Sequence, residues 1–295
     1  MGGLKLMKQY YIISDIHSFA SIMKSSLKKA GFDITNPEHI LIVCGDIFDR
    51  GTETIKVYNF LKKIPSERCI LIRGNHESLY FTLLNKRYPE EHDFSNGTVL
   101  TFCQIAGRSL DIVDDLRVGR YMSYGSYFET EFIDGECLKI WKGIQKKVQE
   151  SPITQWLKSS QWVNYYELGK YIFVHSFIPL KFSPQRMLTE DYCIYYGYTE
   201  YFSFKEDWRE SSNADWEKAS WGCPYVFFDA GLFTPEKEKG KILVCGHYRC
   251  SEFNEHYLAE RNNHNLYRGK NLIAIDATTA LSKQINVLVL SEDEL

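Results

Sequence analysis

Five short apolar segments of this chain are each followed at once by acidic, imidazole, amide or guanidinium side chains. Each segment has four or five residues and is rich in β-branched side chains, so it predicts a strand buried on both faces. Because active sites of open α/β sheets form beyond the carboxyl ends of strands, we expect these polar segments to meet at one edge. The polar segments are Ser14-Asp15-Ile16-His17, Gly45-Asp46-Ile47-Phe48-Asp49-Arg50-Gly51, Arg73-Gly74-Asn75-His76-Glu77, His175-Ser176 and Gly246-His247.

The first strands alternate with helical patterns, at about residues 20–30 and 52–63. Strand and helix in alternation predict the α/β class. Two long segments, at about 78–170 and 181–240, break this alternation and are rich in Tyr, Phe, Trp, Gly and Ser. We interpret both as insertions in a single domain that spans residues 7–290.

Within the first insertion, residues 138–148 and 154–162 have helical patterns. Neither insertion has a sustained alternating strand pattern. The last residues, 291–295, are mostly acidic, and we interpret them as a solvated tail.

Charge and hydropathy exclude several classes of function. The 35 basic and 38 acidic residues give a net charge of −3, which argues against a large nucleic-acid-binding face. No apolar run approaches the roughly 18 residues of a membrane span, and the N-terminus lacks the apolar core of a secretory signal. The eight cysteines form no C-x-x-C pair, and Cys44 and Cys245 lie in apolar runs. We therefore expect a cytoplasmic protein with no membrane partner.

The residue types at the strand ends indicate a metal site. Asp15 and His17 are two residues apart, so both can turn toward one ion, and Asp46 is a candidate bridge between two neighbouring ions. Oxygen and imidazole ligands without thiolate suit Mn, Fe, Zn and similar cations. One such Asp or His alone would be interpreted as a turn or core residue, but five coincident strand ends are hard to explain in that way.

The set S-D-I-H, G-D-I-F-D-R-G, R-G-N-H-E, V-H-S and C-G-H resembles the calcineurin-like metallophosphoesterases. More narrowly it resembles their phosphoprotein phosphatase (PPP) branch, which includes Ser/Thr protein phosphatases, bacterial and phage phosphatases, and diadenosine tetraphosphate hydrolases. Arg50 after Asp49 and Glu77 after His76 are typical of that branch. Arg249 stands where nuclease relatives often carry a second histidine. The resemblance implies a β-sandwich flanked by helices, in four layers α/β/β/α.

The resemblance also implies two divalent or transition metal ions, with Mn the first candidate and Fe, Zn, Ni or Co as others. The implied ligands are Asp15, His17 and Asp46 for the first ion, and Asp46, Asn75, His175 and His247 for the second. In the family, a hydroxide that bridges the two metals attacks phosphorus directly.

Four further residues receive roles from the resemblance. His76 protonates the leaving oxygen and Asp49 orients His76. Arg50 and Arg73 bind the phosphate oxygens. The implied function is a Ser/Thr-type protein phosphatase or a broad phosphomonoesterase. The alternatives are a diadenosine tetraphosphate hydrolase and, from another class, a non-catalytic phosphate- or partner-binding module. The expected partners are a phosphorylated protein or a small phosphoester or nucleotide, and the oligomeric state stays open.

The sequence departs from the family pattern at several positions. Ser14 and Ser18 replace glycines that usually flank the first motif, and we expect a modest shift in loop shape without loss of metal. The Arg that often follows the matching Trp is absent after Trp221. Arg186, Arg209 and Arg249 are candidates to replace it.

An aromatic cluster in the second insertion has three interpretations: a nucleobase-stacking lid, a satellite core over the sheet, or a protein-docking surface. The cluster comprises Tyr192, Tyr195, Tyr196, Tyr198, Tyr201, Phe202, Phe204 and Trp208.

Overall fold

The predicted apolar runs form the parallel strands of two five-stranded sheets in a computed structural model of the chain. It describes residues 7–124, 129–159, 161–182 and 202–295, with the backbone alone at 121–124 and 129–131. The first sheet has the order β14 (Leu288–Ser291), β1 (Gln9–Ile13), β2 (His39–Cys44), β3 (Cys69–Ile72), β6 (Trp162–Val163). The second has the order β12 (Tyr267–Arg268), β13 (Leu272–Ala274), β11 (Ile242–Cys245), β8 (Tyr171–Phe173), β7 (Tyr166–Leu168).

Parallel pairing brings the carboxyl ends of the central strands to one edge. In the first sheet Ile13 of β1 pairs with Val43 of β2, and Cys44 pairs with Ile72 of β3. In the second sheet β11 runs parallel to both β8 and β13. Each polar segment begins where its strand ends, so the five segments emerge together.

The two sheets face one another across an apolar layer. Their facing side chains are almost completely buried, because alternate residues of every central strand point inward. The layer contains Tyr10, Ile12, Ile40, Ile42, Cys44, Ile72, Tyr171, Phe173, Val244, Ile273, Ile275, Leu288 and Leu290. This sandwich is the rigid support for the loops at its edge.

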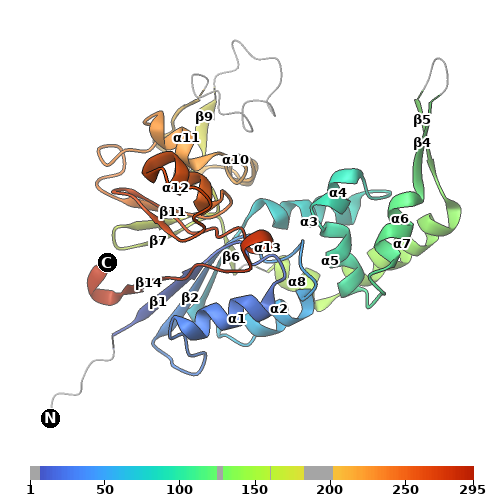
Figure 1. The fold of residues 1–295 in the computed structure, drawn as a ribbon, viewed down its shortest axis with the longest axis horizontal. Coiled ribbons are helices and arrows are strands. Elements are labelled where there is room, and N and C mark those ends of the chain that lie inside the picture. Colours follow the sequence, from blue (N-terminus) through green and yellow to red (C-terminus); the bar gives the residue numbers. More distant parts are fainter. Residues whose placement is uncertain (1–6, 125–128, 160, 183–201) are drawn as a thin grey trace.

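Helices cover the outer faces of both sheets, which confirms the four-layer prediction. On the first sheet, α1 (Ala20–Lys29) buries Ala20, Met23 and Leu27 on one face, and α2 (Thr54–Leu61) packs beside it. On the second lie α10 (Asn213–Ala219), α11 (Pro224–Asp229) and α12 (Cys250–Leu258) (Figure 1). The short α13 (Thr279–Ser282) follows β13.

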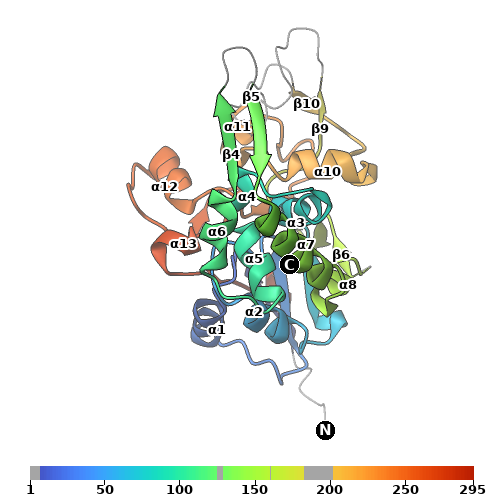
Figure 2. The ribbon, with the colours of Figure 1, turned by 90° about the vertical axis from the view of Figure 1, so that its right-hand side faces the viewer.

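The first insertion is a helical lobe that packs on the same core as α1 and α2. Its helices are α3 (Asn75–Asn85), α4 (Glu91–Ser95), α5 (Thr98–Ile105), α6 (Ile112–Val118), α7 (Gly135–Gln149) and α8 (Pro152–Leu157). A hairpin of β4 (Arg120–Tyr124) and β5 (Glu129–Ile133) extends beyond α6 and α7 (Figures 1 and 2). The expected helix over 154–162 is too long: α8 ends at Leu157, and Trp162 belongs to β6, where it pairs with Leu71.

The second insertion contributes an antiparallel ribbon of β9 (Leu180–Phe182) and β10 (Phe202–Phe204). Trp208 is fully buried, and Phe202 and Phe204 pack against the same cluster. For these three residues the satellite-core interpretation is therefore correct. The five tyrosines of the predicted aromatic cluster, at 192–201, lie outside the described residues.

The C-terminal segment is not a detached tail. Ser291 ends β14 and pairs with Gln9, and Glu292–Glu294 form a short 3-10 turn. Leu295 packs against the core between the two sheets, while Asp293 and Glu294 are exposed to solvent. Among the described residues, no helix is both long enough and apolar enough to cross a membrane.

Candidate metal centre

The loops after the strands hold an unusual number of residues in the left-handed region of backbone conformation. Asp15, His17, Asp46, Asp49 and His247 have φ angles of +52°, +48°, +55°, +74° and +64°. Each such non-glycine residue costs about 1–3 kcal/mol, and the cost is tolerated where the surrounding structure fixes the conformation. The loops are therefore shaped for the placement of side chains. Ser18, which replaces a family glycine, also adopts φ +59°.

The six predicted ligands lie together, arranged on two sides of Asp46. On one side, His17 Nε2 is 3.7 Å from Asp46 Oδ2 and 3.8 Å from Asp15 Oδ1. On the other, His175 Nε2 is 3.3 Å from Asp46 Oδ1 and 2.8 Å from Asn75 Oδ1. Ligand atoms of Asp46, His175 and His247 all lie within 4.8 Å of one another. Asp46 is thus the carboxylate that faces both groups.

The hydrogen bonds of two imidazoles leave lone pairs directed at this centre. His17 Nδ1 lies 3.0 Å from the Phe48 carbonyl, and His175 Nδ1 lies 2.8 Å from the Cys44 carbonyl. Since a carbonyl only accepts, both Nδ1 atoms donate, and in the neutral rings both Nε2 atoms carry lone pairs. Such hydrogen bonds are what orients metal-binding histidines.

The atoms around the Asn75 side-chain oxygen indicate whether these residues fit a metal ion. Asn75 Oδ1 is 3.2 Å from each Asp46 oxygen and 3.2 Å from His247 Nδ1. With His175 Nε2, it faces four atoms that are acceptors in this arrangement. Acceptor atoms placed this close repel one another unless a cation lies among them. The alternative is that the amide is rotated by 180°, so that its NH2 group donates hydrogen bonds to them. The donor set of carboxylate, amide and imidazole fits two divalent ions of the transition series.

Buried charge supports the same conclusion. Asp15 and Asp46 are nearly inaccessible, and burial together with neighbouring carboxylates raises the pKa of each well above its usual value. Burial likewise lowers the pKa of His17 and His247 well below the usual range. Among the described residues, no Lys or Arg forms an ion pair with Asp15, Asp46 or Asp276, so cations are the natural compensation for their charge.

Glu77 fixes two of the loops to each other. Its carboxylate accepts hydrogen bonds from the backbone N–H groups of Gly74, Asp46 and Ile47, at 2.7, 3.1 and 3.1 Å. A Cβ atom at Gly74 would lie 2.2 Å from Asp46 Oδ1, so a larger residue does not fit there. The Glu of the R-G-N-H-E motif therefore acts on loop position and not on the metal.

His76 and Asp49 form a buried pair at the rim of the centre. His76 Nδ1 lies 2.7 Å from Asp49 Oδ2, and His76 Nε2 lies 3.8 Å from Asp46 Oδ2. Burial raises the pKa of Asp49 to about 7, while hydrogen bonds from Thr101 and Thr98 oppose that rise. These hydroxyls donate to Asp49 Oδ1 and Oδ2 at 2.7 and 2.8 Å.

Both threonines belong to α5 of the first insertion, and sequence reasoning missed them. Their approach depends on Gly97, which has φ +83° and whose added Cβ would lie 2.4 Å from the Arg50 backbone nitrogen. A T-x-x-T spacing after a glycine carries no specific signal, so only the packing of the insertion identifies them.

Replacing Thr101 by Val should lower kcat for a phosphomonoester about tenfold, because two hydrogen bonds to Asp49 are lost. Steady-state kinetics at saturating Mn measures the change. Thr101→Ser keeps the hydroxyl and should recover most of the rate. An unchanged kcat for the Val variant would mean that the threonine has no influence on the His76–Asp49 pair.

The predicted phosphate-binding arginines divide between two hollows. Arg50 and Arg249 line a hollow of about 160 Å³ together with His76 and Trp221. Arg73 instead lines an adjoining hollow of about 200 Å³ that shares His175 with the centre.

The three candidates for the missing third arginine have different outcomes. Arg249 lies at the centre, as stated above. Arg209 pairs with Glu167 and Glu238 elsewhere. Arg186 lies outside the described residues.

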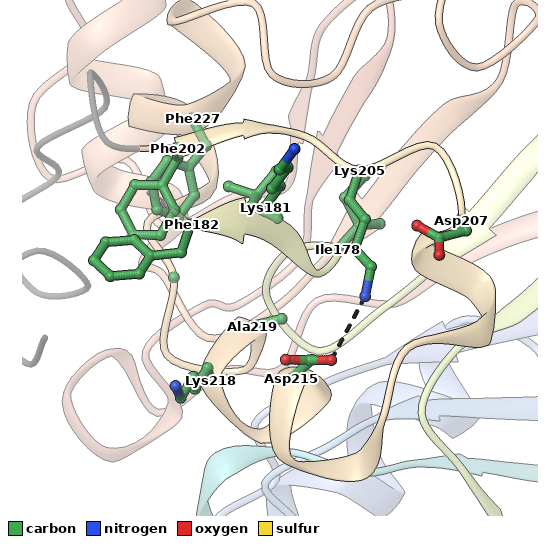
Figure 3. A pocket seen from close by; sticks show the side chains of 12 residues that line it. Ile178, Lys181, Phe182, Phe202, Lys205, Asp207, Asp215, Lys218, Ala219 and Phe227 are labelled. Atoms are coloured by element: carbon green, nitrogen blue, oxygen red, sulfur yellow. Dashed lines mark ion pairs between the residues drawn. The ribbon is translucent and has the colours of Figure 1, made fainter. Parts of the chain in front are cut away.

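A larger hollow of about 550 Å³ is lined in part by Gly222, the residue after Trp221. Phe182, Phe202 and Phe227 gather on one wall, and the Lys205–Asp215 ion pair stands on another (Figure 3). This hollow contains none of the predicted metal ligands.

Known proteins resemble this chain in sequence and in fold. The family model described as calcineurin-like phosphoesterase matches residues 9–272. A crystal structure of a mutant cold-active protein tyrosine phosphatase aligns with a TM-score of 0.50 and 16% identity, over 97% of this chain and 76% of that one. At that identity the likeness concerns the fold alone.

Two curated relatives match shorter segments. A Shewanella-like protein phosphatase 1 from Plasmodium berghei (strain Anka) is 38% identical over 90 residues, which cover 27% of this chain and 25% of the relative. A symmetrical bis(5'-nucleosyl)-tetraphosphatase from Wigglesworthia glossinidia brevipalpis is 34% identical over 68 residues, 23% of this chain and 24% of the relative. The matches span about a quarter of the length of each relative.

Proposed function

The chain belongs to the calcineurin-like phosphoesterase family, and from this membership we propose that it hydrolyses phosphoric esters with two divalent metal ions. The observation that carries the proposal is the convergence of six ligands on two sides of Asp46, beside a buried His–Asp pair. Asp15, His17 and Asp46 would hold one ion, and Asp46, Asn75, His175 and His247 the other. When bound, the two ions supply Lewis acidity at the phosphoryl oxygens and a nucleophile at neutral pH.

The remaining residues act on the substrate and on the proton. His76 protonates the leaving oxygen from Nε2, and Asp49 fixes the ring through Nδ1. This role uses the imidazolium form of His76, because a neutral ring that donates from Nδ1 carries a lone pair on Nε2. Asp49 is held in turn by Thr98 and Thr101, so the pair is oriented before substrate binds. Arg50, at the rim of the same hollow, offers a guanidinium to the phosphoryl oxygens, where negative charge is concentrated.

Within this reaction class, the first candidate is a broad phosphomonoesterase that includes Ser/Thr-type protein phosphatase activity. The motif set alone supports it. The second candidate is hydrolysis of dinucleoside polyphosphates, which the match to the tetraphosphatase from Wigglesworthia favours.

Comparing kcat/KM for a phosphoserine peptide and for diadenosine tetraphosphate distinguishes the two candidates. The first candidate predicts a higher value for the peptide, in the same Mn buffer. A preference for the tetraphosphate would reject the first candidate and establish the second.

A further inference from the structure

We propose that the hollow lined by Arg73 is a second anion subsite, which takes a phosphate group linked directly to the one that is hydrolysed. This inference rests on the proposed function, because it places the hydrolysed group at the metal centre. It deepens the second candidate function, in which the substrate carries a chain of phosphates.

The first observation is the state of Arg73. Its side chain is half-buried and lies over the Trp162 ring, with Cζ 6.0 Å from the ring centroid. No hydrogen bond or ion pair engages its guanidinium among the residues that the structure describes. An anion in the hollow would supply the missing interaction.

Arg209 and Arg68 show how other partly buried arginines of this chain are satisfied. Arg209 pairs with two carboxylates, those of Glu167 and Glu238. Arg68 donates to the backbone carbonyls of Ile34, Asn36 and His39. Since partly buried guanidinium groups usually have such acceptors, the contrast singles out Arg73.

The second observation is the position of the hollow. It is lined by Gly74 and His175, and Asn75 next to Gly74 lines the hollow of the metal centre. Its volume of about 200 Å³ has room for a phosphate group. Because Gly74 lines this hollow and Asn75 lines that of the metal centre, an anion bound here lies next to the group bound at the metal centre. A phosphoanhydride chain meets that condition more directly than an acidic side chain of a peptide.

The third observation is the polar lining. Asn164 Nδ2 donates to Asn213 Oδ1 at 3.1 Å, which joins the loop after β6 to the start of α10 across the hollow. Ser78 adds a further hydroxyl to the lining. Glu217 is the one carboxylate in the described lining, and it is exposed, so solvent screens its charge.

A wider hollow of about 450 Å³ continues outward from this one and shares Arg73, Asn164, Asn213 and Trp216 with it. Tyr165, also in its lining, stacks on Trp216 with ring centroids 5.2 Å apart. The rest of a polyphosphate substrate therefore has room beyond the second phosphate.

Binding of two small probes to the Mn-loaded protein tests the subsite without requiring turnover. Calorimetry measures the affinities of methylphosphonate, which has one anionic group, and methylenediphosphonate, which has two, at equal free Mn. The diphosphonate should bind about tenfold or more tightly, as expected for a charge-assisted contact. In Arg73→Met its affinity should fall about 10–100-fold, with a much smaller change for methylphosphonate.

Asn213→Asp is an independent variant. It keeps the oxygen that accepts from Asn164 and suits the start of α10, but adds negative charge to the hollow. It should weaken the diphosphonate about threefold to tenfold and leave methylphosphonate unchanged.

Equal losses for both probes in Arg73→Met would mean that Arg73 binds the hydrolysed phosphoryl group itself, and would overturn the second subsite. Binding of methylphosphonate with no preference for the diphosphonate would also overturn it, while leaving the proposed function intact. Failure of the wild-type protein to bind either probe would contradict the proposed function.

Discussion

Replacing His76 by Asn is expected to lower kcat by about 10²–10⁴ while both metal ions stay bound, because the variant loses the proton donor to the leaving oxygen. His76 Nδ1 is engaged by Asp49, so its Nε2 is the atom available to the substrate. The loss should be smaller for p-nitrophenyl phosphate than for a phosphoserine peptide, since nitrophenolate leaves without protonation. Steady-state kinetics and elemental analysis of the same preparation measure both quantities.

The metal content of His76→Asn distinguishes a general acid from a metal ligand. Ligand atoms of His17, Asp46 and His76 also lie within 4.8 Å of one another, so His76 itself has the geometry of a metal ligand. Loss of metal from His76→Asn would assign it that role and contradict general acid catalysis. Asp49→Asn is the matched control, because it disturbs the orientation of His76 without removing an imidazole.

Replacing Asp46 by Asn should remove the shared ligand and reduce the metal content from two ions per chain to one or none. Substituting a residue that only contacts a metal ligand already lowers metal affinity about 10–100-fold. Removing the Asp46 carboxylate itself should therefore lower metal affinity by more than about 100-fold. Activity should fall in parallel. Titration with Mn, followed by elemental analysis after gel filtration, measures the stoichiometry.

The metal-free forms provide the control for Asp46→Asn. In the absence of metal, Asp46 is buried near other carboxylates, and burial with their charge raises its pKa well above the usual value. Removing its charge should therefore leave the Tm of the metal-free protein equal or higher, while the Tm with Mn falls. A lower Tm in both forms would mean that Asp46 serves mainly to hold the fold together.

The strand ends could be predicted from sequence because each functional group follows a short apolar run directly. Parallel pairing of β1, β2 and β3 then brings Asp15, Asp46 and Asn75 to one edge. This inference needs only the strand periodicity and the rule for active sites of α/β sheets. The four layers followed from the family resemblance and not from composition.

Long-range packing of the insertions could not be predicted in this way. Thr98 and Thr101 contact Asp49 only because α5 packs on the same core as α1 and α2. Trp162 follows a helical pattern in sequence, but it pairs as a strand beside β3. Leu295 packs against the core between the sheets although the residues before it are acidic. In each case tertiary burial overrode the local signal.

Arg73 shows that the sequence could not predict on which side of its strand end a side chain lies. The motif associates it with phosphate, but not with a particular phosphate. The structure directs it to a hollow beside the one that Arg50 lines. Sequence spacing fixes which strand end carries a residue, and not which side of that strand end its side chain occupies.

Hydrolysis of p-nitrophenyl phosphate by the Mn-loaded protein, compared with the same protein stripped by a chelator, tests the central claim most directly. We predict turnover that requires Mn, saturates at two ions per chain and returns when Mn is restored to the stripped protein. A folded protein that binds two Mn ions and releases no nitrophenol would contradict the assignment as a phosphoester hydrolase.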